Sequence, residues 1–89
     1  MMTYKEVLAW LVELETEELV YDAHYDTINK VVSFHTDINY SASESVMHLL
    51  RTLEQIAYTT TVKEFLPSND ENTYVYFMDG YWIHWIFWR

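Results

Sequence analysis

The chain has 89 residues, of which 51% are hydrophobic and 18% aromatic, and it contains no cysteine. Fourteen acidic residues against five basic ones give a formal net charge of −9. This composition excludes a disulfide or zinc-thiolate scaffold, is too hydrophobic for a disordered chain, and disfavours direct binding to nucleic acid or to an anionic membrane. We therefore expect a single acidic domain over residues 1–89 that is stabilised by packing around a small core.

The first expected element is a helix that begins at Tyr4. Thr3 and Glu6 have the spacing of a capping box, in which each side chain accepts a hydrogen bond from the backbone of the other residue. The apolar residues that follow recur at helical spacing up to Leu14. Continuation of this helix past Glu15 would turn acidic residues toward the buried face, so we expect a break there.

A second helix is expected after Thr16, its N-cap, because the apolar and acidic residues that follow fall on opposite sides of a helix. Its outer face would carry Glu18, Asp22 and Asp26. Several β-branched residues weaken the helical pattern. The sequence therefore leaves open whether residues 26–38 form a helix or a strand.

The segment 41–57 predicts the third helix most clearly, because the capping sequence 41–44 is followed by apolar residues at helical spacing. The threonines and valine at 59–62 lack helical preference and end this helix. A polar loop is expected over residues 67–72, which begin with the only proline. Residues 62–66 are the candidate for an additional strand.

The C-terminal residues predict a β-hairpin. Two β-rich segments, 73–78 and 81–88, are separated by an Asp-Gly dipeptide at 79–80, which favours a two-residue turn. Such a turn fixes the register, so Met78 should pair with Tyr81 and the following pairs continue in step. The sequence thus indicates an α+β fold with about three helices packed on one face of a C-terminal antiparallel hairpin or small sheet.

Both faces of this hairpin are apolar, whereas a sheet with one face in water usually alternates apolar and polar residues. One face must pack on the helices, and the other should meet a partner, a second copy or another part of the chain. The face with Phe77 and Trp82 looks like a core, and tyrosine and tryptophan are enriched at binding hot spots. We therefore expect the exposed face to be the one that carries Tyr74, Tyr76, Tyr81 and Trp85.

Acidic residues without an intervening base cluster between positions 13 and 26. Such a run often does no more than solvate a surface, but beside an exposed aromatic face it would suit a basic partner. The expected partner-binding residues therefore combine both groups: Glu13, Glu15, Glu17, Glu18, Asp22, Asp26, Tyr74, Tyr76, Tyr81 and Trp85.

No catalytic, cofactor or metal site is expected. The histidines lack metal-ligand spacing, since the positions four residues before and after His24 hold Val20 and Ile28. The only glycine, Gly80, belongs to the predicted turn, so no glycine-rich loop is available for phosphate, and no nucleophile motif occurs. Enzymatic activity is therefore disfavoured.

The expected function is binding to a protein with a basic, nucleic-acid-binding surface, as an inhibitor or adaptor. The alternative is a homo-oligomeric structural or accessory protein that associates through its aromatic hairpin. In its small size, acidity, low glycine content and many aromatics, the chain is similar to phage-encoded inhibitors such as anti-CRISPR, anti-restriction and other DNA-mimic proteins. This similarity of composition assigns no residues. Without a secretory signal or a long apolar stretch, we expect a cytoplasmic protein.

Overall fold

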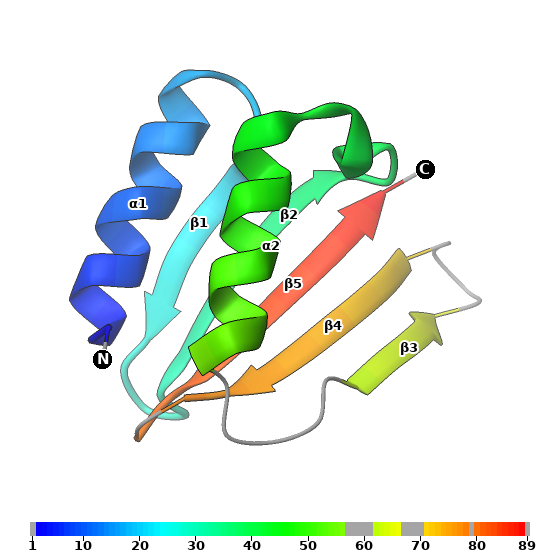
Figure 1. The fold of residues 1–89 in the computed structure, drawn as a ribbon. Helices are drawn as coiled ribbons and strands as arrows, with labels where there is room; N and C mark the ends of the chain where they lie inside the picture. The colour runs from blue at the N-terminus through cyan, green and yellow to red at the C-terminus, as the bar shows by residue number, and fades with distance from the viewer. Residues whose placement is uncertain (1, 57–61, 67–70, 79, 89) are drawn as a thin grey trace.

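The computed structural model describes residues 2–56, 62–66, 71–78 and 80–88, in which two α-helices pack on one face of a mixed five-stranded sheet (Figure 1). The helices are α1 (Tyr4–Thr16) and α2 (Glu44–Ile56), with a short 3-10 helix, η1 (Tyr40–Ala42), before α2. The strands are β1 (Tyr21–Asp26), β2 (Val31–Asp37), β3 (Val62–Leu66), β4 (Glu71–Phe77) and β5 (Trp82–Trp88). Outside the described residues lie the predicted helix end at 57–61, most of the predicted loop at 67–70, and Asp79. The α+β class and the packing of the helices on one sheet face are confirmed.

The strand order across the sheet is β1-β2-β5-β4-β3. The central strands β2 and β5 are parallel, and every other neighbouring pair is antiparallel. Within the described sheet, the pairing of β2 with β5 therefore joins the N-terminal hairpin β1–β2 to the C-terminal strands β3–β5. The sheet is mixed rather than antiparallel, because the last strand of the chain runs beside β2 in the same direction.

Both helices begin at their predicted caps. In α1 the Glu6 N–H donates to Thr3 Oγ1 at 3.3 Å, and the Thr3 N–H donates to Glu6 Oε1 at 2.9 Å, which completes the capping box. At the start of α2 the Val46 N–H donates to Ser43 Oγ at 3.3 Å. These local hydrogen bonds satisfy backbone donors that have no partner within the helix.

The C-terminal hairpin has the predicted register. The Met78 N–H donates to the Tyr81 carbonyl at 2.8 Å, and the expected pairs continue along β4 and β5. Gly80 has a φ of +83°, in the left-handed region that a side chain disfavours. The candidate strand at residues 62–66 is present as β3, and β4 begins at Glu71, inside the predicted loop.

The predicted second helix is wrong, because residues 21–37 form the antiparallel hairpin β1–β2. In β2 the residues Val32, Phe34 and Thr36 are buried, and those between them are less so, which is the two-residue period of a strand. The β-branched residues of this segment favour the extended backbone. As a strand, β2 buries one face under the helices. The free energy of this burial favours the strand over the helix that the spacing of the acidic residues predicts.

The predicted exposure of the tyrosine face is also wrong. The helices cover this face: Tyr76 and Trp85 are fully buried, Tyr81 is 3% exposed and Tyr74 is half-buried. Trp82, on the opposite face, is 41% exposed. The amphipathic rings belong to the core, and the face that the sequence analysis assigned to the core faces away from the helices.

Trp85 lies at the centre of this core. Its ring centroid is 5.1 Å from that of Phe34, 5.2 Å from Tyr40 and 6.1 Å from Tyr74. Its indole N–H donates to Thr36 Oγ1 at 2.7 Å, so its polar atom is satisfied inside the protein. Hydrogen bonds of this kind offset the desolvation cost of burying the polar atom of a large amphipathic ring.

Replacement of each tryptophan by alanine should distinguish the buried face of β5 from its exposed face. Trp85→Ala should lower the free energy of unfolding by about 3–5 kcal/mol, because it leaves a large cavity and an unpaired Thr36 hydroxyl. Trp82→Ala should cost less than about 2 kcal/mol, because its ring is already 41% exposed. Urea denaturation followed by circular dichroism measures both values. A larger loss in Trp82→Ala than in Trp85→Ala would contradict this assignment of the faces.

Candidate functional site

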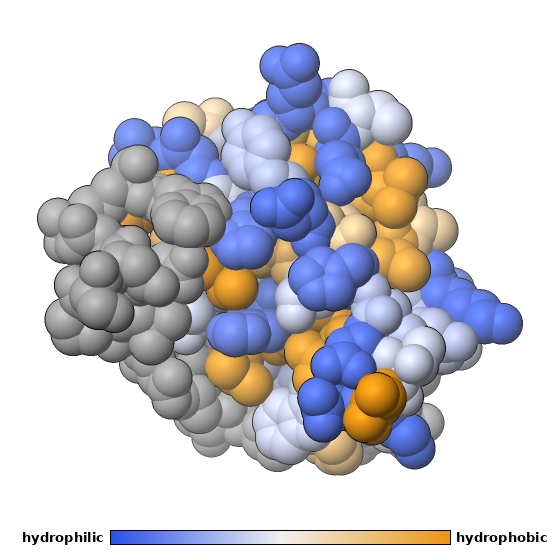
Figure 2. Space-filling model, turned by 180° about the vertical axis from the view of Figure 1, so that it is seen from behind, coloured by the Kyte–Doolittle hydropathy of each residue, from blue (hydrophilic) through white to orange (hydrophobic). Residues whose placement is uncertain are grey.

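None of the described residues forms a helix on the side of the sheet away from α1 and α2, and we call this side the open face. Figure 2 looks at the molecule from this side and shows hydrophobic and hydrophilic residues interleaved on it. These residues alternate along the strands with the buried ones and come from four neighbouring strands. By their pairing they include His24, Val31, Ser33, His35, Val75, Phe77, Trp82, His84 and Ile86, whereas Thr73 has the same register but is only 1% exposed.

One end of the open face, next to the two hairpin turns, is apolar and aromatic. Val31, Trp82 and Phe77 lie side by side on β2, β5 and β4. The rings of Phe77 and Trp82 are in contact, with centroids 4.8 Å apart. Ile28, in the adjoining β1–β2 turn, is 89% exposed. An exposed group of large apolar side chains is typical of a surface that contacts another macromolecule.

The middle of the open face is polar. Ser33 of β2 pairs with His24 of β1 on one side and with His84 of β5 on the other. His35 follows two residues further along β2 on the same face. Among the residues that the structure describes, no three histidine or carboxylate side chains converge where a metal ion could bind. The imidazoles instead supply hydrogen-bonding groups between the apolar side chains.

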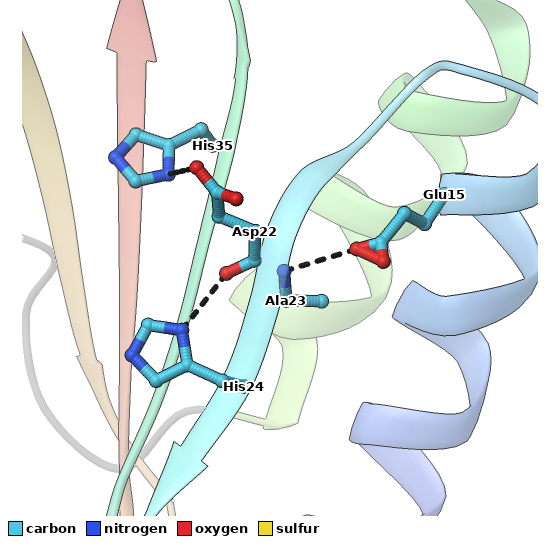
Figure 3. A network of polar contacts seen from close by, with 5 residues as sticks. All are labelled: Glu15, Asp22, Ala23, His24 and His35. Carbon is cyan, nitrogen blue, oxygen red and sulfur yellow. Dashed lines mark hydrogen bonds and ion pairs between the residues drawn. The ribbon is translucent and has the colours of Figure 1, made fainter.

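The edge strand β1 carries a bulge at Asp22, where the pairing with β2 shifts and φ is +54° (Figure 3). The Asp22 carbonyl accepts a hydrogen bond at 2.9 Å from His24 Nδ1, which therefore carries the proton. The Asp22 carboxylate lies 3.8 Å from His35 Nδ1. On the helix side, Glu15 Oε1 accepts from the Ala23 N–H at 3.2 Å. The bulge thus breaks the exposed edge and keeps acid beside the open face.

The C-terminus of α1 places acidic residues where local physics disfavours them. The Leu19 N–H donates to the Leu14 carbonyl and the Glu18 N–H to the Glu15 carbonyl, both at 3.0 Å, which is the Schellman pattern. Glu18 has a φ of +61° at the position where glycine is usual. Glu17 and Glu18 also lie at the negative end of the helix dipole, and the last turn has no basic residue.

The six acidic residues expected to bind a partner follow the end of α1 and the edge strand β1 rather than one face of a helix. Two of them accept hydrogen bonds from the backbone: Glu15 from β1 and Asp26 from the β1–β2 turn. The exposed members, which are available to a partner, are Glu13, Glu17, Glu18 and Asp22. The four expected aromatic residues belong to the core side of the sheet: Tyr74, Tyr76, Tyr81 and Trp85.

Asp26 is a turn residue. Its Oδ1 accepts from the backbone N–H groups of Ile28 at 2.9 Å and Asn29 at 3.1 Å, and its Oδ2 accepts from Asn29 Nδ2 at 2.9 Å. These hydrogen bonds, with those from Asn29 the strongest, hold the pKa of Asp26 below its ordinary value of 3.8. The spacing of Asp26 and Asn29 is typical of a side-chain-capped turn, so the sequence could have predicted this role.

The α1–β1 connection, the end of β2 and the start of α2 lie at the same end of the molecule (Figure 1). Residues from these segments, which are far apart in the sequence, line a pocket of about 360 Å³. Sequence reasoning missed it because no single segment contains its residues. The lining combines aliphatic, aromatic and acidic side chains, among them Glu18, Leu19, Tyr21, Asp37, Tyr40 and Val46.

Comparison of the chain with protein-family models, with curated proteins and with solved structures finds no match. Among the described residues, no helix has the length and apolar character needed to cross a membrane. The described residues form two layers, in which two helices pack on one face of a mixed sheet and no described helix lies on the other face. Any functional conclusion must therefore come from the side chains on that face and around it.

Glu18→Gly should stabilise the protein. Glycine adopts the left-handed backbone conformation of Glu18 without steric cost. This relief of strain in the folded state is larger than the destabilising effect of the entropy that glycine adds to the unfolded chain. We expect a gain of about 0.5–1 kcal/mol in the free energy of unfolding, measured by urea denaturation. Glu13→Gly, in the exposed interior of α1, is the matched control and should be destabilising. A loss of stability in Glu18→Gly would show that the carboxylate is needed for folding.

Acid should weaken the β1–β2 turn. Because the folded-state pKa of Asp26 is lowered, its stabilising contribution is complete above the ordinary value of 3.8 and is lost as the pH falls through the folded pKa. A ¹³C NMR titration of the Asp26 carboxyl group should give a pKa below 3.8. Asp26→Asn should be less stable than wild type at neutral pH and should lose less stability in acid. A measured pKa at or above the ordinary value would refute this role of the turn.

Proposed function

We propose that the chain is a protein-binding module that docks its open face on a basic, nucleic-acid-binding surface of another protein and acts as an inhibitor or adaptor. The observation that carries this proposal is the open face, which no described helix covers and which has an exposed tryptophan at one end and acidic residues along its edge. The proposed activity is binding without catalysis.

The aromatic end of the open face supplies the anchor for such an interface. Trp82 is 41% exposed and rests on Phe77, so its ring is held in place before a partner arrives. Tryptophans in this setting often dominate interface energies, because they bury a large area with little loss of conformational freedom. Val31 and Ile28 extend the apolar area toward the adjacent turn. This end of the face is therefore suited to enter a hollow on a partner.

The charge of the chain determines which partner fits. A net charge of −9 repels nucleic acid and membrane phosphates and attracts surfaces rich in lysine and arginine. Asp22 is exposed beside the open face, and Glu17 and Glu18 project from the neighbouring end of α1. Carboxylates in these positions would occupy sites that otherwise hold phosphate groups. Competition with nucleic acid for the partner follows from this arrangement.

The proposal is tested on a purified complex after the partner has been captured on immobilised chain and identified by mass spectrometry. Trp82→Ala should weaken binding at least about tenfold, because the anchor is lost while the fold remains. Binding should also weaken as the salt concentration rises, and DNA should compete with the chain for the partner. Val12→Ala, an exposed position on α1 that is away from the open face, is the control and should bind like wild type.

Two outcomes would contradict the proposal. Equal affinity of Trp82→Ala and wild type would exclude the open face as the contact surface. A dimer detected by size-exclusion chromatography with light scattering, and converted to a folded monomer by Trp82→Ala, would assign this face to self-association of the chain.

A further inference from the structure

We infer that the pocket between the end of α1 and the start of α2 binds the guanidinium group of an arginine side chain supplied by the basic partner. This inference rests on the proposed function and names the chemical group that a second part of the surface would recognise. The pocket lies at the end of the sheet opposite the start of β5, where Trp82 lies, so it would extend the interface to a second point.

The pocket has the size and the aliphatic walls that a long side chain requires. Its volume of about 360 Å³ falls within the range of small-ligand sites. Leu19 is partly buried and Val46 is 1% exposed, and both line the interior. The methylene groups of an arginine side chain can pack on such walls while the charged end reaches the rim.

Two carboxylates line the same pocket. Asp37 Oδ1 accepts a hydrogen bond from the Asn39 N–H at 2.8 Å, which fixes the orientation of this carboxylate. Glu18 is held at the pocket by its left-handed backbone and the Schellman hydrogen bonds of α1. The planar fork of a guanidinium binds oriented carboxylates through paired hydrogen bonds, whereas an ammonium group binds as a point charge.

Aromatic rings provide a second kind of contact for a cation. Tyr21 lines the pocket and is 45% exposed. Tyr40 also lines it and is fixed by stacking on Phe87, with ring centroids 5.0 Å apart, and by a hydroxyl contact of 3.2 Å with Tyr74. Burial raises the pKa of Tyr40, so its ring stays neutral. A guanidinium group stacks favourably on the faces of such rings.

The local charges favour a cation over an anion. None of the described residues that line the pocket is a lysine or an arginine. The C-terminal end of α1 contributes the negative pole of its dipole. The positive pole of α2 is offset, because Ser43 Oγ accepts the Val46 N–H and Glu44 occupies the first turn. The pocket therefore presents negative potential around an aliphatic interior.

An NMR titration of the full chain with L-arginine amide tests the inference. Backbone signals of residues at the pocket, such as Leu19 and Tyr40, should shift with a dissociation constant on the order of millimolar, as expected for one side chain without the rest of the partner. L-citrulline amide, which has nearly the same shape and no charge on its side chain, should cause no such shifts. L-lysine amide should bind several-fold more weakly than L-arginine amide.

Charge-neutral variants locate the site. Glu18→Gln and Asp37→Asn should each weaken binding of L-arginine amide at least about fivefold, because each removes one carboxylate from the pocket. The amide introduced by Asp37→Asn keeps an oxygen that can accept the Asn39 N–H. Glu54→Gln removes the same charge from an exposed position on α2 that does not line the pocket, and should bind like wild type. Glu18→Gly should also lose binding while unfolding at a higher urea concentration than wild type, which separates loss of the site from loss of the fold.

The inference is overturned if L-citrulline amide or L-lysine amide binds as tightly as L-arginine amide, or if the shifts spread evenly over the acidic surface. The proposed function is tested by a separate measurement, the affinity of Trp82→Ala for the partner. If L-arginine amide does not bind but the complex with the partner still depends on Trp82, the proposed arginine site is wrong and the proposed protein-binding function is still supported. If Trp82→Ala does not change the affinity for the partner while the pocket binds L-arginine amide, the open face is not the contact surface and the arginine site is still supported.

Discussion

The parallel pairing of β2 with β5 is the contact on which the rest of the structure depends. It joins two hairpin-containing halves that share no other strand pair among the described residues, and it aligns Phe34 with Trp85 at the centre of the sheet. Across this seam the Trp85 indole donates to Thr36, so the largest core side chain is fixed by a hydrogen bond as well as by packing. Without this pairing, the N-terminal half would keep only the two-stranded hairpin β1–β2, which is marginally stable as an isolated unit.

Because the helices lie on one side of this sheet, the two faces of β5 have different physical roles. Trp85 is buried, and its aromatic neighbours surround it on the helix side. Trp82, three residues earlier, points to the open face and contributes less to folding. A small domain with a limited core thus leaves a large aromatic side chain in water. This is an unfavourable arrangement for an isolated chain and a favourable one for a chain that binds a partner.

At the end of α1, too, surface residues are present that do not favour the stability of the fold. Glu18 and Asp22 both have left-handed backbone conformations, which cost a residue with a side chain more than they cost glycine. Glu17 and Glu18 also oppose the helix dipole. These local costs place carboxylates around the pocket and along the open face. They motivate the proposal that the acids serve recognition, since a glycine at position 18 would serve the fold better.

The sequence by itself determined the features that depend on neighbouring residues. The capping box of α1, the start of α2, and the register of the β4–β5 hairpin follow from local hydrogen bonds and turn chemistry, and all three are confirmed. Only the tertiary structure decided whether residues 21–37 are helix or strand and which face of β5 is buried. Both choices depend on β2, whose polar side chains Ser33 and His35 can remain on the open face only if Trp85 faces the helices. A pairing between strands that lie about fifty residues apart in the chain leaves no local pattern from which it can be read.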